Sequence, residues 1–251
     1  MTRLTRKPKT PQQTAQQTRT LAALEAAIPQ CQACVRLREH CQTVAQTKVR
    51  RFASDEYWGK PVSGFGDPAA RVLIVGLAPA AHGANRTGRV FTGDRSGDFL
   101  YAALYRAGLA SQPDSVSRDD GLILYGAYVS AATRCAPPDN RPTPDELATC
   151  RPFLRAELSL LPKLRVVIAL GAIGHQAVEL ALRDVAQPGD PRVPKFAHGQ
   201  RSLLTLDPTR SLWLLDCYHV SQQNTFTGRL TPKMLDDVLR QAKVLAQLDA
   251  A

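Results

Sequence analysis

The sequence predicts a three-layer α/β/α fold with a central, mostly parallel sheet of four strands. Short apolar runs rich in β-branched residues recur along the chain, as they do in parallel strands buried on both faces. Segments with helical periodicity alternate with these runs, which is the order expected when helices cover both faces of a sheet. The 251 residues, 44% of them hydrophobic, are enough for one sizeable core in a single domain.

Residues 1–19 are basic and rich in Gln and Thr, without periodic apolar residues. This composition predicts a disordered tail, so we expect the folded domain to cover residues 20–251. Within that domain, Leu21, Leu24 and Ile28 share one face of a short amphipathic helix that Pro29 ends.

The rest of the chain gives four strands and four further helices in alternation. We expect the strands at 72–77, at the end of 121–132, at 164–170 and at 212–218, with 203–206 as a candidate for a short extra strand. We expect the helices at about 96–109, 143–161, 171–183 and 231–248. Ser96 is the expected cap of the first of these helices, and residues 187–200, rich in Pro and Gly, predict a loop.

Net charge and hydropathy indicate what kind of partner the protein binds and whether it is a membrane protein. The 32 Lys and Arg residues exceed the 22 Asp and Glu residues by ten, which favours a polyanionic partner such as nucleic acid, with a merely solvated basic surface as the alternative. No apolar run approaches the roughly 18 residues of a membrane span, and the basic N-terminus lacks the apolar segment of a secretory signal. We therefore expect an intracellular protein without a membrane partner.

Three polar loops follow predicted strand ends, at residues 78–94, 133–142 and 219–229. Ligands bind outside the carboxyl ends of the strands in open α/β sheets, so these loops are expected to converge on one cleft. The first loop is the longest and richest in glycine. Glycines let the backbone approach a ligand closely, and a long loop inside a compact domain is more often functional than idle.

Six cysteines stand at positions 31, 34, 41, 135, 150 and 217. Their spacing in an intracellular chain suggests a metal site rather than disulfides. Cys31, Cys34, Cys135 and Cys150 supply four thiolates, enough for a four-iron four-sulfur cluster or a tetrahedral zinc, and spacing alone does not separate the two. Unconnected core cysteines are the alternative. Cys41 is expected as a buried thiol that could replace a ligand, and Cys217 as a core residue.

Three segments resemble the family 5 uracil-DNA glycosylases, also called UDGb: the glycine loop from Gly76 to Asp94, the stretch Arg134-Cys-Ala-Pro-Pro-Asp-Asn140, and the stretch from His219 to Thr231. The resemblance covers nearly the whole chain beyond residue 20. It implies a base-excision repair enzyme that removes uracil, hypoxanthine and xanthine from double-stranded DNA, and it favours an iron-sulfur cluster over zinc. We accordingly expect a cytoplasmic, nucleoid-associated monomer.

One position departs from the wider superfamily, in which an acidic residue usually follows the first glycine by two positions and holds the water. Ala78 stands there in this chain, as is typical of UDGb. The nearest carboxylate in the matched stretch is Asp94, the family's candidate for that role. Asp94 could orient water or stabilise the cationic sugar, and capping the following helix is its alternative role.

The departing base gains negative charge as the glycosidic bond breaks, so its oxygen needs a donor. His219, at a strand end, could hydrogen-bond or protonate that oxygen, and a structural histidine is the alternative. The amide of Asn140 suits the edge of an extruded base, although a turn residue would also fit there. By resemblance Phe91 stacks on the base, unless it anchors the loop in the core. The backbone at Gly76, Ala78 and Ala80 would line the base.

By resemblance, the loop after His219 enters the minor groove. Its polar residues and the arginines that flank the three loops are the expected DNA contacts, although each arginine alone could be a plain surface charge. They are Ser221, Asn224, Thr225, Thr227, Arg86, Arg89, Arg134, Arg141 and Arg229.

No lysine occurs in the three segments, which predicts a monofunctional glycosylase without Schiff-base chemistry. The alternative is an iron-sulfur or zinc module that binds nucleic acid without catalysis. A nucleotide hydrolase is disfavoured because the glycine loop lacks the Gly-Lys-Ser/Thr of a phosphate loop.

Overall fold

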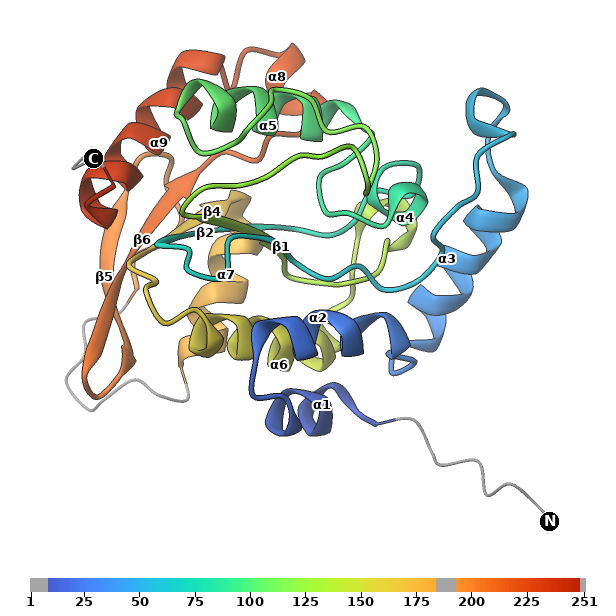
Figure 1. The fold of residues 1–251 in the computed structure, drawn as a ribbon, viewed down its shortest axis with the longest axis horizontal. Coiled ribbons are helices and arrows are strands. Elements are labelled where there is room, and N and C mark those ends of the chain that lie inside the picture. Colours follow the sequence, from blue (N-terminus) through green and yellow to red (C-terminus); the bar gives the residue numbers. More distant parts are fainter. Residues whose placement is uncertain (1–8, 184–192, 249–251) are drawn as a thin grey trace.

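The computed structural model describes residues 9–183 and 193–248 (Figure 1). The strands are β1 Phe65–Gly66, β2 Val72–Gly76, β3 Ala127–Ala131, β4 Val166–Leu170, β5 Arg201–Asp207 and β6 Arg210–Cys217. The α-helices are α1 Pro11–Gln17, α2 Leu21–Ala27, α3 Val35–Thr47, α4 Ala84–Thr87, α5 Arg95–Arg106, α6 Pro144–Leu160, α7 Gly171–Leu182, α8 Gln222–Phe226 and α9 Pro232–Ala246. Three 3₁₀ helices in the described chain are η1 Ile28–Gln30, η2 Arg50–Phe52 and η3 Pro138–Asn140.

The six strands form one mixed sheet in the order β1-β3-β2-β4-β6-β5. The four inner strands are parallel, and Ile74 of β2 pairs with Val129 of β3 and Ile168 of β4. The two edge strands are antiparallel to their neighbours. The four predicted strands are therefore present, but a sheet of four strands is wrong. The candidate extra strand at 203–206 is confirmed as part of β5, which has the half-exposed pattern typical of an edge, whereas β1 has two residues, too few for a periodic signal.

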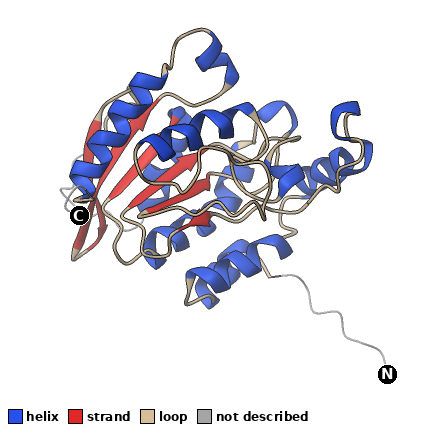
Figure 2. Ribbon diagram, turned by 45° about the horizontal axis from the view of Figure 1, so that its top comes forward, coloured by secondary structure: helices blue, strands red, loops and turns tan. Residues whose placement is uncertain are grey.

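Helices cover both faces of the sheet, as predicted (Figure 2). On one face, α5 and α9 pack against side chains such as Ile74 and Ile168. On the other face, α6 and α7 pack against the alternate positions, such as Leu73 and Val167. Every residue of β2, β3 and β4 is buried, which explains why these strands are continuous apolar runs rather than alternating ones.

The N-terminal region differs from the prediction. Thr10 and Gln13 form a capping box, Pro11 takes the first helical position, and the resulting α1 packs against α6 (Figure 1). A disordered tail over 1–19 is therefore wrong for residues 11–17, because local capping compensates for their weak apolar pattern. Residues 1–8 lie outside the described chain, as does the part of the predicted 187–200 loop up to residue 192.

No helix in the described ranges has the length and apolarity that crossing a membrane would require.

Candidate active site

The loop after β2 returns to the strand end through Phe91. The phenyl ring occupies the space that a Cβ on Gly76 would need, and the Phe91 carbonyl lies against Gly97 of α5 in the same way. Phe91 has φ +51°, a left-handed conformation that is rare for a bulky side chain. Such strain persists only where its surroundings enforce it, and it concentrates at functional sites. The two glycines enforce it here.

His219 lies beside this ring, two residues after the end of β6. The ring centroids of His219 and Phe91 are 6.2 Å apart, with the planes tilted by 37°. The imidazole makes no hydrogen bond with any described residue, while its own carbonyl accepts one from Asn224 Nδ2 at 2.8 Å. Burial lowers the pKa of His219 to about 4. The side chain is therefore neutral at pH 7, with a ring N–H available for a ligand.

Asp94 is the N-cap of α5, so the expectation that Ser96 caps this helix is wrong. One carboxylate oxygen of Asp94 accepts the backbone N–H groups of Ser96 at 2.9 Å and of Gly97 at 3.0 Å. Its other oxygen lies against Gly83, where a Cβ would overlap it. Burial raises the pKa of Asp94, and the two backbone hydrogen bonds oppose that shift. The capping alternative is thus confirmed, with one oxygen still facing the glycine loop.

Backbone donors line the same loop. The N–H groups of Ala78 and Ala80 donate to no acceptor within the described residues, and both residues are half-buried. Unpaired backbone N–H groups at a strand end are suited to a ligand oxygen.

Asn140 lies on the loop after β3, the neighbour of β2 in the sheet. Asn140 and the preceding Asp139 both have left-handed backbones, with φ of +56° and +53°. The Asn140 side chain is exposed and makes no hydrogen bond with the described part of the protein. The structure therefore brings Gly76, Phe91 and His219 together, places Asp94 at the start of α5 against Gly83, and leaves Asn140 exposed on the adjacent loop.

Several predicted phosphate contacts are structural instead. The guanidinium of Arg89 is buried and binds both oxygens of Asp120, at 2.8 and 2.6 Å. Arg86 bonds to Asp55 at 2.8 Å and to the carbonyl of Gly93 at 2.9 Å. Arg134 is also buried. These three arginines hold the loops in shape, so the prediction that Arg89 binds DNA is not supported.

The segment after His219 presents a more accessible surface. Ser221 is the N-cap residue of α8, and the Thr225 hydroxyl donates back to its carbonyl at 3.3 Å. Arg229 is exposed and lies over the ring of Tyr218 at 4.7 Å. Phe226 was missed by the sequence analysis, yet 75% of it is exposed. As the aromatic residue of a largely polar loop, it could have been recognised from the sequence.

The four candidate cysteine ligands lie close enough for the charge of one thiolate to shift the pKa of the others. Burial raises the pKa of Cys31 and Cys34, and the charge of Cys135 raises both further. The pKa of Cys150 is also raised by burial and by the Cys135 charge, while its sulfur accepts the backbone N–H of Arg134 at 3.3 Å. Within the described ranges, no group of three or more His, Cys, Asp or Glu residues is arranged to hold a metal ion.

Comparison with known proteins places this arrangement in a family. Residues 63–243 match the model of the uracil DNA glycosylase superfamily. The chain is 53% identical over 224 residues to a type-5 uracil-DNA glycosylase of Mycobacterium leprae, covering 89% of this chain and 94% of that protein. It is 51% identical over 230 residues to the Mycobacterium tuberculosis protein of the same name (91% and 83% covered), and 50% identical over 220 residues to that of Thermus thermophilus (87% and 94% covered). The resemblance seen in the sequence is thereby confirmed, and the chain belongs to the type-5 uracil-DNA glycosylases, hydrolytic N-glycosylases of the uracil DNA glycosylase superfamily.

Proposed function

We propose that this protein is a monofunctional glycosylase that removes uracil, hypoxanthine and xanthine from double-stranded DNA and leaves an abasic site. The observation that carries the proposal is the neutral imidazole of His219, which has no hydrogen-bond partner in the described chain and lies beside the ring of Phe91, whose backbone is strained. We also propose that it acts as a monomer at the nucleoid.

Phe91 and the backbone of Gly76 would form one wall for an extruded base. Stacking on an aromatic face tolerates many bases, because every base has a π-face. Such a wall supports the proposal that hypoxanthine and xanthine are accepted as well as uracil. The N–H groups of Ala78 and Ala80, which have no acceptor among the described residues, would donate to a carbonyl oxygen of the base without demanding one pattern of substituents.

His219 would stabilise the charge that develops on the departing base. Because burial lowers its pKa to about 4, the imidazole meets the base as a neutral hydrogen-bond donor rather than as an acid that gives up a proton. A donor already fixed in a buried site has little reorganisation to undergo when the bond breaks.

Asp94 would act at the sugar. Its capping oxygen is bound to α5, which leaves the second oxygen to orient water toward C1′ or to stabilise the positive charge on the sugar. Water adds to C1′ as the C1′–N bond breaks, and the base leaves with the electron pair of that bond and gains a proton. Asn140, on the adjacent exposed loop, is the candidate to read the edge of the base.

The cysteines Cys31, Cys34, Cys135 and Cys150 would hold a four-iron four-sulfur cluster, with zinc as the less favoured alternative. Four thiolates suit either group, and the resemblance to the family favours the cluster. The group would act structurally, joining the segment before α3 to the loop that carries Asn140.

Elemental analysis and visible absorbance test this cofactor. We expect iron with the broad visible absorption of an iron-sulfur protein, and loss of folding or solubility in Cys135→Ser before any change in base preference. Cys217→Ser, in the core of β6, is the matched control and should retain iron. Stoichiometric zinc would overturn the assignment.

Single-turnover cleavage of duplexes carrying one uracil, hypoxanthine or xanthine tests the activity. Strand breaks should appear only after hot alkali, and His219→Ala should lower the rate by at least about 100-fold while retaining DNA binding. Strand cleavage without alkali would contradict a monofunctional mechanism. If cluster-loaded protein bound the duplexes and cleaved none, a binding module without catalysis would be the better description.

A further inference from the structure

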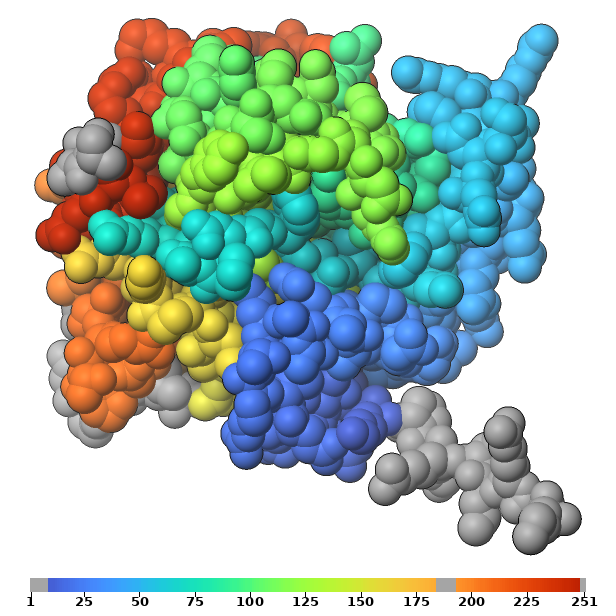
Figure 3. Space-filling model, viewed as in Figure 1, coloured from blue at the N-terminus to red at the C-terminus, as the bar shows by residue number. Residues whose placement is uncertain are grey.

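A hollow of about 450 Å³ lies on the other side of the glycine loop. Gly88 and Arg89 line it, whereas Phe91 and Asp94 of the same loop belong to the active site. Its other walls come from α2, η1, the segment from Trp58 to β1, and Arg118. It opens between the blue N-terminal helices and the green segment around residue 118 (Figure 3). The volume is in the range of small-molecule sites, about 300–1,000 Å³.

The polar end of the hollow is a fixed carboxylate. Glu25 Oε1 accepts the hydroxyl of Tyr128 at 2.7 Å, and Oε2 has no partner within the described chain. Tyr128 reaches Glu25 because Gly64 lacks a side chain: a Cβ there would overlap the phenol ring. Burial raises the pKa of Glu25, as expected for a carboxylate withdrawn from water. The surroundings thus hold this acceptor in place with one oxygen free.

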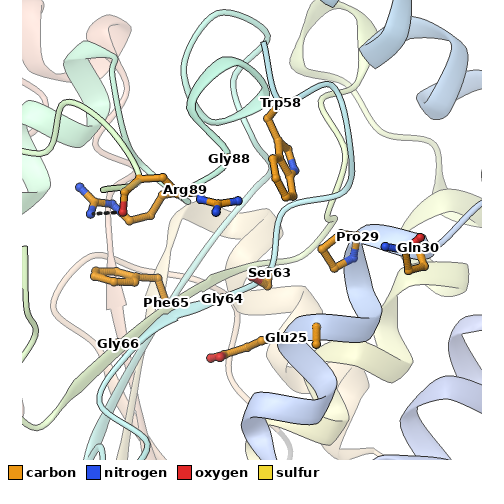
Figure 4. A pocket seen from close by; sticks show the side chains of 12 residues that line it. Glu25, Pro29, Gln30, Trp58, Ser63, Gly64, Phe65, Gly66, Gly88 and Arg89 are labelled. Atoms are coloured by element: carbon orange, nitrogen blue, oxygen red, sulfur yellow. Dashed lines mark hydrogen bonds between the residues drawn. The ribbon is translucent and has the colours of Figure 1, made fainter. Parts of the chain in front are cut away.

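The opposite end is aromatic and cationic (Figure 4). The indole of Trp58 is fixed by a hydrogen bond from Nε1 to the carbonyl of Pro61 at 3.1 Å. The Arg118 guanidinium, which lines the hollow, lies 4.8 Å from the centre of the indole ring. The nearest carboxylate to Arg118 is that of Asp119, at 3.9 Å and largely exposed, so this charge is weakly neutralised.

We propose that this hollow binds a nucleotide whose base carries an exocyclic amino group, that is guanine, adenine or cytosine. The base would take the place of the Arg118 guanidinium on the Trp58 ring, with its amino edge on Glu25 Oε2, and Arg118 would then pair with the phosphate. Carboxylates accept from such amino groups. Uracil and thymine are disfavoured, because their N3–H is flanked by two carbonyl oxygens that would face the carboxylate. The ligand is either a free nucleotide or the terminal nucleotide of a strand.

Tryptophan fluorescence measures this binding directly, since Trp58 and Trp213 are the two tryptophans of the chain. In a Trp213→Phe background, dGMP and dCMP should quench Trp58 saturably, and dTMP should bind at least about tenfold more weakly. Glu25→Gln should lower the affinity for dGMP about tenfold, because a charge-assisted hydrogen bond is lost. Glu39→Gln, on the exposed surface of α3, is the matched control and should change nothing.

Two further comparisons make the test specific. Arg118→Gln should weaken dGMP but not deoxyguanosine, which lacks the phosphate. His219→Ala should leave nucleotide binding unchanged, whatever its effect on base excision. A trinucleotide with a terminal guanine that binds more tightly than dGMP would identify a strand end as the ligand, and equal affinity a free nucleotide. Absence of quenching by every nucleotide, equal affinities for dGMP and dTMP, or loss of binding in His219→Ala would each overturn the proposal.

Discussion

At the scale of single residues, burial keeps His219 neutral, and this should be measurable as a pH dependence of the stability of the protein. Its pKa is about 4 when folded, against an ordinary value of 6.5. Between these values the unfolded chain binds more protons, so stability rises with pH. The difference in unfolding free energy between wild type and His219→Asn should therefore grow by on the order of 1–3 kcal/mol from about pH 4 to pH 6.5. Urea denaturation across this range measures it, and a constant difference would show that His219 is not buried as a neutral group.

Asp94 has two separable tasks, because its cap needs an acceptor and its proposed chemistry needs a charge. Asp94→Asn keeps an oxygen for the N–H groups of Ser96 and Gly97, so stability should change by less than about 0.5 kcal/mol while the excision rate falls at least about 100-fold. Asp94→Ala removes the cap as well and should cost about 1 kcal/mol.

Thermal denaturation and single-turnover rates of the two Asp94 variants provide the comparison. Full activity in Asp94→Asn would assign Asp94 to the cap alone. Excision should also weaken on mild acidification, because burial raises the pKa of Asp94 and its charge is lost earlier than that of an exposed aspartate.

At the scale of elements, α8 presents Phe226 to solvent directly after the active-site strand. An apolar side chain inserted between bases can fill the gap left by an extruded nucleotide, and this matters only where the base must leave a stack. Phe226→Ala should therefore slow uracil excision about tenfold or more from duplex DNA and much less from single strands. Val244→Ala, another exposed apolar residue on α9, is the control. Equal slowing on both substrates would argue against insertion.

Periodicity explains which elements could be predicted. β2 and β4 are continuous apolar runs, and their order with the helices was enough to give the layers. β1 and α1 were not predicted from the sequence. β1 is only two residues long, and α1 depends on the Thr10 capping box rather than on an apolar stripe. Local sequence also indicates which residues are charged but not what they contact: Asp120, which neutralises Arg89, is 31 positions away in the chain.

At the scale of the whole molecule, a buried ion pair connects the sheet to the layer that carries Cys150. Arg134 Nη2 binds Glu157 Oε2 of α6 at 2.6 Å, and both side chains are within 2% of full burial. Ser130 of β3 completes the network, with hydrogen bonds to Glu157 at 2.6 Å and from Arg134 at 2.7 Å. Arg134 also precedes Cys135 in the chain. The pair therefore fixes the position of the loop that carries Asn140 relative to the sheet.

Removing one partner of this pair should be more costly than removing both. Glu157→Gln leaves the Arg134 guanidinium buried without its counter-charge, which should cost about 3–5 kcal/mol of unfolding free energy. The double variant Arg134→Met with Glu157→Leu leaves no buried charge and should recover much of that loss. Recovery is favoured because Arg134 Nε and Glu157 Oε1 have no hydrogen-bond partner among the residues that the structure describes, so the native pair is incompletely compensated. Urea denaturation measures the unfolding free energy of the two variants. If the double variant were less stable than Glu157→Gln, the ion pair itself would stabilise the contact between the sheet and α6.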